Sequence, residues 1–285
     1  MFNSKLKKAA IKNLQKAAEG YNKQFNDTAH KMEELQKIRE YSVKILNDLS
    51  QYISDLANSP IEYDTTIAQT TARCNHFNER VEQLKKESQE INLHAGSTAG
   101  AGALAGAGVA AAAPSLAISI AMTFGTASTG TAIASLSGAA AMNAALAWLG
   151  GGALAAGGAG MAGGTALLAL ANPVGLAIGA LAILGGGWWA SSKNKEIAEK
   201  AEKSTRAIKK EIERMKEIEV QVGVWKEETY ELNTKIKTYH TMFEDRKMFN
   251  YNLFSEADKD MLRILINSAE TLSKKIGETV QDTQK

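Results

Sequence analysis

Residues 96–125 read GSTAGAGALAGAGVAAAAPSLAISIAMTFG, and they belong to the stretch that decides the fold of this 285-residue chain. Between Ile91 and Ser192 there is no Asp, Glu, Lys or Arg, and these 102 residues hold 21 of the 24 glycines. This charge-free stretch is several times longer than the roughly 20 residues of one membrane span. It must be buried in protein, buried in lipid, or able to move between the two.

Two charged arms flank the charge-free stretch. Residues 1–94 carry 14 Lys and Arg against 13 Asp and Glu, and residues 193–285 carry 19 against 18. Arms so close to neutral argue against a general nucleic-acid-binding surface. A lone cysteine, Cys74, fits a reducing compartment, and the first residues lack the apolar core of a secretory signal. We expect cytoplasmic synthesis and action at the inner cell membrane, with export without a signal peptide still open.

Both arms have the apolar spacing of long helices. In the first arm, Ser59-Pro60 should end one helix, and Cys74 should be a small core residue of the next. The second arm predicts a long helix over 193–248, followed by a helix that begins at a capping box of Ser255 and Asp258. The expected stripes are Ile38, Ile45, Leu49, Tyr52, Leu56; Ile67, Thr71, Cys74, Phe77, Val81, Leu84, Ile91; Ile208, Ile212, Met215, Val222, Trp225, Thr229, Leu232, Ile236, Tyr239, Phe243; and Met261, Leu265, Leu272, Ile276, Val280.

Four long helices in two pairs favour a bundle. The predicted fold is therefore all-α, a long coiled-coil-like helical bundle enclosing a Gly/Ala-rich hydrophobic helical segment. The predicted organisation is a helical arm at 1–94, a membrane-interacting segment at 95–192 and a second helical arm at 193–285.

Proline and glycine divide the charge-free stretch into pieces at about 99–124, 128–149, 150–171 and 173–190. Two membrane spans are expected in an inserted state, with four as the alternative, because an even number returns both arms to one side. Glycines four residues apart allow close helix packing, and aromatic residues followed by lysines are typical of a membrane interface. The packing candidates are Gly96, Gly100, Gly102, Gly106, Gly160, Gly164, Gly175 and Gly179, and the interface candidates are Trp188, Trp189, Lys193 and Lys195.

A basic face begins the chain. Lys5, Lys8, Lys12 and Lys16 share one side of the expected helix, opposite a face of Leu6, Ala10, Leu14 and Ala17. Such a face can hold an anionic regulator, either acidic lipid or an oligonucleotide. It can equally be the solvated face of a bundle helix.

The glycine motif and the histidines of this chain lack the sequence context of a catalytic or metal site. Gly158, Gly160 and Gly163 match G-x-G-x-x-G, but no strand pattern precedes them and no acidic residue follows at the required distance. The four histidines show no metal-ligand spacing. We expect no enzyme, no catalytic residue, no metal and no cofactor.

Heptad-patterned arms around one apolar segment resemble the α-helical pore-forming toxins of the ClyA and haemolysin BL type. Residues 114–164 are similar in texture to the Gly/Ala-rich core of interferon-induced membrane proteins. In role, the chain is similar to the membrane-disrupting effectors of bacterial anti-phage defence. These resemblances imply a pore-forming or channel effector, cytotoxic on insertion of residues 95–190 and assembled as a homo-oligomer of four or more chains. The alternative is a helical scaffold or interaction protein that buries the Gly/Ala segment in a soluble oligomer.

Overall fold

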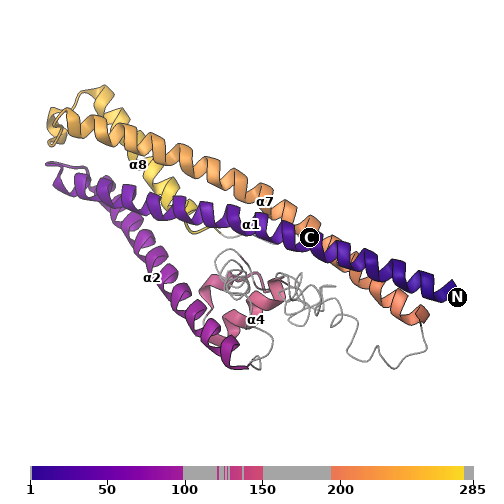
Figure 1. Cartoon of the computed structure of the whole chain (residues 1–285). Coiled ribbons are helices and arrows are strands. Elements are labelled where there is room, and N and C mark those ends of the chain that lie inside the picture. Colours follow the sequence, from indigo (N-terminus) through magenta and orange to yellow (C-terminus); the bar gives the residue numbers. More distant parts are fainter. Residues whose placement is uncertain are drawn as a thin grey trace. The chain divides into compact units, whose positions relative to one another are not determined.

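The structure, a computed structural model, describes residues 2–98, 129–136, 138–149 and 194–278, together with Ala121, Gly125 and Ala127. Within these residues the chain is all-α, as predicted. The helices are α1 (Phe2–Asp55), α2 (Ile61–Thr98), α4 (Gly138–Leu149), α7 (Asn194–Asp245) and α8 (Glu256–Lys275), with 3-10 turns η1 (Ile133–Ser135) and η4 (Tyr251–Leu253) (Figure 1).

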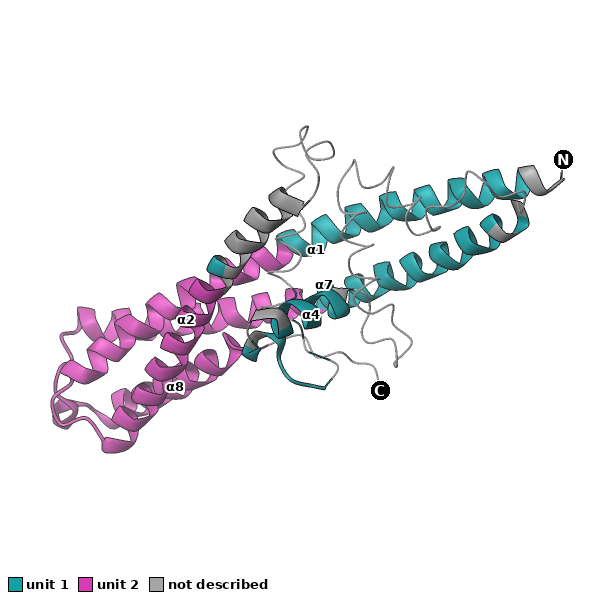
Figure 2. Cartoon of the chain, turned by 90° about the horizontal axis from the view of Figure 1, so that it is seen from below, with its two compact units in different colours: residues 1–30, 84–220, 279–285 teal, residues 31–83, 221–278 magenta. Residues whose placement is uncertain are grey.

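The chain forms two compact units (Figure 2). Unit 1 comprises residues 1–30, 84–220 and 279–285, and unit 2 comprises residues 31–83 and 221–278. Helices α1 and α7 each contribute their first part to unit 1 and their second part to unit 2. Each unit therefore contains residues from both charged arms.

Proline separates the first two helices where the sequence predicts the break. Helix α1 ends at Asp55 and α2 begins at Ile61, directly after Pro60. The Pro60 carbonyl accepts hydrogen bonds from the amides of Tyr63, at 2.9 Å, and Asp64, at 3.3 Å. The proline therefore starts the first turn of α2, where a missing amide donor costs nothing.

Unit 2 has a hydrophobic core of its own, built from α1, α2, α7, α8 and the residues that join α7 to α8. Phe243 lies in it with no exposed surface, stacked on Phe254 at 5.5 Å between ring centroids and on Tyr52 at 6.2 Å. Cys74 is also fully buried, and burial raises the pKa of its thiol to about 11. The prediction that Cys74 is a small core residue is confirmed.

The long stripe of α7 packs against α1, and the two helices run parallel. In unit 1, Gly20 faces Ile212. Further along unit 1, the Gln24 amide donates to the Glu219 carboxylate. In unit 2, the Lys226 ammonium lies 2.7 Å from the Glu34 carboxylate, and Lys237 donates to the Tyr41 hydroxyl at 3.3 Å. In each unit the residue numbers of the two helices therefore rise together. The predicted α7 stripe is buried or half-buried throughout. The predicted stripes of α1, α2 and α8 are likewise confirmed, apart from Leu84, Ile91 and Val280, whose side chains lie outside the described residues.

Polar residues interrupt the apolar stripes of α1 and α7 inside unit 2. Arg39 and Ser42 on α1, and Thr229 and Asn233 on α7, are all buried. The Arg39 guanidinium lies 5.5 Å from the centre of the Trp225 ring, and burial lowers the pKa of Arg39 to about 10. We expect this buried charge to favour the packing arrangement that keeps Trp225 beside it.

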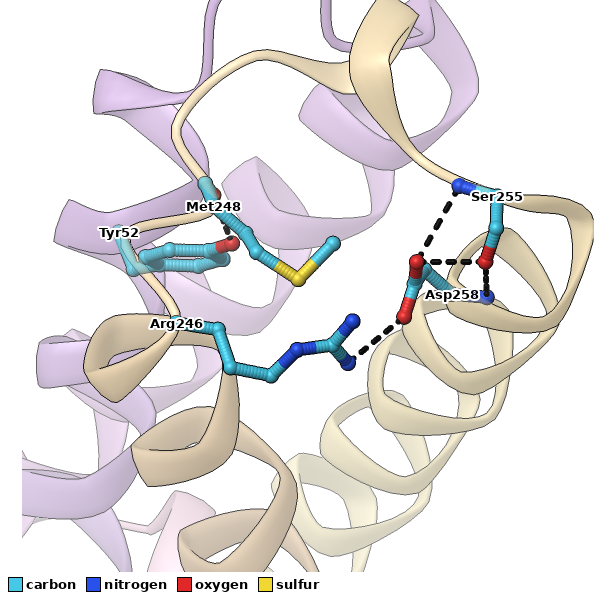
Figure 3. Close-up of polar contacts among 5 residues, drawn as sticks. All are labelled: Tyr52, Arg246, Met248, Ser255 and Asp258. Carbon is cyan, nitrogen blue, oxygen red and sulfur yellow. Dashed lines mark hydrogen bonds and ion pairs between the residues drawn. The ribbon is translucent and has the colours of Figure 1, made fainter.

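The predicted capping box at the start of α8 is present (Figure 3). The Asp258 amide donates to the Ser255 hydroxyl oxygen, and the Ser255 amide donates to the Asp258 carboxylate, both at 3.2 Å. Arg246, one residue beyond the end of α7, donates to the same carboxylate at 2.8 Å. Nearby, the Tyr52 hydroxyl of α1 donates to the Met248 carbonyl. These bonds fix the turn from α7 into α8.

Replacing Ser255 with alanine should lower the free energy of unfolding by about 1 kcal/mol, because one amide donor of α8 loses its acceptor. Urea denaturation of the full chain, followed by circular dichroism, measures this change. Ser54→Ala, on an exposed position of α1, is the matched control and should change stability by less than about 0.5 kcal/mol. Equal effects of the two substitutions would contradict the capping role.

The Asp258 carboxylate gives the same turn a pH dependence. Its pKa is lowered by the Ser255 hydrogen bond first and by Arg246 second. Because its pKa is lower in the folded chain, the Asp258 carboxylate stabilises the fold at pH values above its unfolded pKa of about 3.9. This stabilisation is lost as the pH falls through the folded pKa. In Asp258→Asn the free energy of unfolding should therefore lack the fall at acid pH that protonation of this carboxylate causes.

The structure describes part of the charge-free stretch, and only some of those described residues are helical. Of the piece 128–149, residues 138–149 form α4, which is about 18 Å long at 1.5 Å per residue. A turn precedes it, in which the Ala127 amide donates to the Thr131 carbonyl at 2.7 Å and Gly130 has φ +81°. Among the described helices, none has both the length and the apolar character to cross a membrane. The pieces 150–171 and 173–190, and 99–124 except Ala121, lie outside the described residues.

Candidate functional site: the contact between α4 and α7

The candidate site is the place in unit 1 where the charge-free stretch meets a charged arm. Helix α4 buries Ala141, Ala145 and Trp148, which lie on one face at spacings of four and three. Gly125 packs against this face: a Cβ added there would stand 3.1 Å from the Trp148 ring and 2.9 Å from Ile133. The same Cβ would meet the Ala121 carbonyl oxygen more closely still, so it is chiefly the backbone of Ala121 that requires glycine at position 125.

Arg214 of α7 binds both the backbone and the ring of Trp148. Its Nη2 donates to the Trp148 carbonyl at 2.7 Å, and its guanidinium carbon lies 4.7 Å from the ring centre. Trp148 is the second-last residue of α4, where helix carbonyls lack partners and the helix dipole is negative. A cation at this point satisfies a terminal carbonyl and complements the dipole.

A buried carboxylate holds the guanidinium in place. Glu211, one turn earlier on α7, accepts from Arg214 Nε at 2.9 Å and from Nη2 at 2.5 Å. The two side chains are only 8% and 12% exposed. Such a pair is strongly coupled, because removal of either charge takes from the other, buried side chain the ion pair that the two form.

Tyr21 of α1 completes the group, which we call the Arg214 cluster: Tyr21, Trp148, Glu211 and Arg214. Tyr21 is 1% exposed and stacks on Phe25 at 6.2 Å between ring centroids. Burial, and next the Glu211 carboxylate, raise the pKa of Tyr21 well above its usual range. The phenol therefore stays neutral beside the ion pair, and three segments far apart in sequence meet at one buried charge pair.

Trp148 brings a buried polar atom into the cluster. The Trp148 indole nitrogen is buried and makes no hydrogen bond to any residue that the structure describes. A buried donor without an acceptor costs about 1–3 kcal/mol. Arg214 therefore stabilises the docked position of α4, and the buried indole N–H destabilises it.

The sequence-predicted sites lie elsewhere. Lys5, Lys8, Lys12 and Lys16 are exposed along α1. Of the opposite face, Ala10, Leu14 and Ala17 are buried, whereas Leu6 is 46% exposed. Lys195 is exposed and lies 3.9 Å from Glu199. Gly96 lies in α2. Outside the described residues lie Gly100, Gly102, Gly106, Gly160, Gly164, Gly175, Gly179, Trp188, Trp189 and Lys193.

The sequence pattern did not single out the Arg214 cluster. One signal was present: Glu211 and Arg214 stand between Ile208, Ile212 and Met215, so charged residues border the apolar stripe of α7. Nothing in the spacing indicates that α4 supplies their partner. In the part of the chain that the structure describes, no group of three His, Cys, Asp or Glu is placed to hold a metal ion.

Comparisons with protein-family models, with curated proteins and with solved structures give no match to this chain.

Proposed function

We propose that this chain is a membrane-active effector that inserts residues 95–190 into a bilayer and forms a pore or channel after a trigger. The observation that carries the proposal is the charge-free stretch of 102 residues between two charged arms. A single Asp, Lys or Arg at the centre of a membrane helix costs about 2.5–3.5 kcal/mol. The whole stretch avoids this cost at every position.

The independence of the unit 2 core supports this proposal. Within the part of the chain that the structure describes, its buried residues all come from 43–77 and 236–276, and none comes from the charge-free stretch. Departure of α4 from its docked position therefore exposes no described residue of this core. A core that does not draw on the inserting stretch is the arrangement that an inserting protein requires.

The Arg214 cluster supports a change between two states. Insertion requires an element with two arrangements, and a trigger acts by binding one of them better. In the docked arrangement the Trp148 indole N–H is buried without an acceptor. At a membrane interface, an indole ring meets apolar chains while its N–H reaches polar groups. Undocking of α4 therefore relieves a cost that docking imposes.

A helical scaffold is the second candidate, and the docking of α4 favours it. Gly125, Ile133 and Trp148 pack closely in unit 1, as expected for a Gly/Ala segment buried in a soluble assembly. In this reading the Arg214 cluster is a permanent structural contact, and the arms recruit partners.

Dye release from liposomes separates the two functions. Purified full chain should release a trapped dye, and Ala182→Glu, which places a charge in the piece 173–190, should abolish release. Ala68→Glu, on an exposed position of α2, is the matched control and should leave release unchanged. Intact liposomes with the wild-type chain at all lipid compositions, pH values and salt concentrations, and no sedimentation with lipid, would reject the effector and favour the scaffold.

A pore also needs more than one chain, and we propose a homo-oligomer of four or more. The exposed Lys5, Lys8, Lys12 and Lys16 are the proposed contact for acidic lipid or an oligonucleotide as regulator. Their exposure on one helix is compatible with that role and with simple solvation.

A further inference from the structure

Unit 2 contains an open groove of about 840 Å³ between α1 and α7. This volume is within the roughly 300–1,000 Å³ of small-molecule sites. Its walls include Lys37 and Tyr41 from α1, and Tyr230, Asn233 and Lys237 from α7. None of these residues belongs to the Arg214 cluster or to the charge-free stretch.

Cations outnumber carboxylates among the residues that line the groove. Lys37, Lys237 and Arg246 line it against the single carboxylate of Asp245. Lys37 and Arg246 already have carboxylate partners, Glu33 and Asp258, each at 2.8 Å. Lys237 donates only to the Tyr41 hydroxyl, at 3.3 Å, and forms no ion pair with any described residue. A ligand anion can therefore bind Lys237 without breaking an existing ion pair.

Two tyrosine rings face solvent in this groove. Tyr41 is 45% exposed and Tyr230 is 61% exposed. Tyr230, Thr234 and Lys237 lie on one stripe of α7, at spacings of four and three. The seven residue steps from Tyr230 to Lys237 span about 10 Å along the helix. A ring that stacks on Tyr230 can thus belong to the same ligand as a phosphate that binds Lys237.

Asn233 adds an unpaired amide to the same wall. Its side chain is 4% exposed, and its amide oxygen makes no hydrogen bond to any residue in the described ranges. Buried amides usually have partners. The edge of a nucleobase carries both donors and acceptors, so it can pair with an amide in either orientation.

We propose that this groove is a nucleotide-binding site. The base stacks on Tyr230 beside the Asn233 amide, and the phosphates bind the Lys237 ammonium. The ligand class follows from the combination of an exposed ring, an unpaired amide and a cation without a carboxylate on one face of α7. The site does not depend on the proposed membrane activity.

Fluorescence titration of the full chain with mant-ATP tests the site. Saturable binding is expected, weakened about tenfold by Tyr230→Ala through loss of stacking and about tenfold by Lys237→Gln through loss of the phosphate contact. Lys235→Gln, an exposed lysine two residues away that does not line the groove, is the matched control and should bind like the wild type. Circular dichroism should show unchanged helix content in all three variants, because the replaced side chains are exposed.

Competition defines the ligand class. Unlabelled ATP should displace mant-ATP at lower concentration than tripolyphosphate does, because tripolyphosphate has no ring for Tyr230. Equal competition by the two, together with wild-type affinity of Tyr230→Ala, would reduce the site to a polyphosphate contact and overturn the proposal. Absence of saturable binding at millimolar mant-ATP, or equal effects of Lys235→Gln and Lys237→Gln, would also overturn it.

Discussion

Arg214→Met is expected to release α4 from α7 and to cost unit 1 about 3–5 kcal/mol, because the buried Glu211 carboxylate loses its counter-charge. The substitution also removes the hydrogen bond to the Trp148 carbonyl and the cation over the indole ring. Amide hydrogen exchange followed by mass spectrometry measures the release. Peptides covering 138–149 should exchange at least 100-fold faster than in the wild type, since about 3 kcal/mol corresponds to more than a 100-fold change in an opening equilibrium.

Two variants make this result specific. Arg206→Met removes an arginine from the same helix that is 72% exposed, and it should leave exchange in 138–149 unchanged. Glu211→Met together with Arg214→Met removes both charges, and it should recover much of the lost protection because no uncompensated charge stays buried. Equal protection in the single and double variants would show that the ion pair does not hold α4.

Phe243→Ala should have a comparable effect on unit 2, lowering its free energy of unfolding by about 3–5 kcal/mol. Phe243 is fully buried, and its ring stacks on Phe254 and Tyr52. Alanine leaves a cavity where α1 and α7 meet the residues that lead into α8. Urea denaturation of the full chain, followed by circular dichroism, measures the loss.

Phe249→Ala is the matched control for this experiment. Phe249 is 47% exposed and touches Tyr52 only at a tilted angle, with 6.0 Å between ring centroids. Its removal should cost less than about 1 kcal/mol, as most surface substitutions do. A loss for Phe249→Ala as large as that for Phe243→Ala would contradict the assignment of the core.

Helix positions were predictable because local rules decide them. Pro60 cannot continue a helix, and Ser255 with Asp258 forms a cap from its own neighbours, so both boundaries follow from a few adjacent residues. The stripe of α7 follows from the same periodicity. The direction of its partner did not follow, since heptad spacing is the same for parallel and antiparallel neighbours.

The Arg214 cluster was not predictable for a different physical reason. Its energy comes from contacts between residues 66 positions apart, Trp148 and Arg214, and no local pattern encodes such a pairing. The interruption of the piece 128–149 was also missed. Gly130 adopts a positive φ within a turn there, and glycine is too common in this stretch for one position to indicate a turn.

The buried Arg39 restricts how α7 can move against α1. Sliding α7 by one heptad would bring Ile218 or Leu232 to the guanidinium in place of Trp225, so a buried charge would lose its aromatic neighbour. Buried polar residues are known to fix the register of paired helices in this way. We therefore expect that sliding of α7 along α1 by one heptad is disfavoured within unit 2, whereas a rotation or separation that keeps the register is not opposed by this contact.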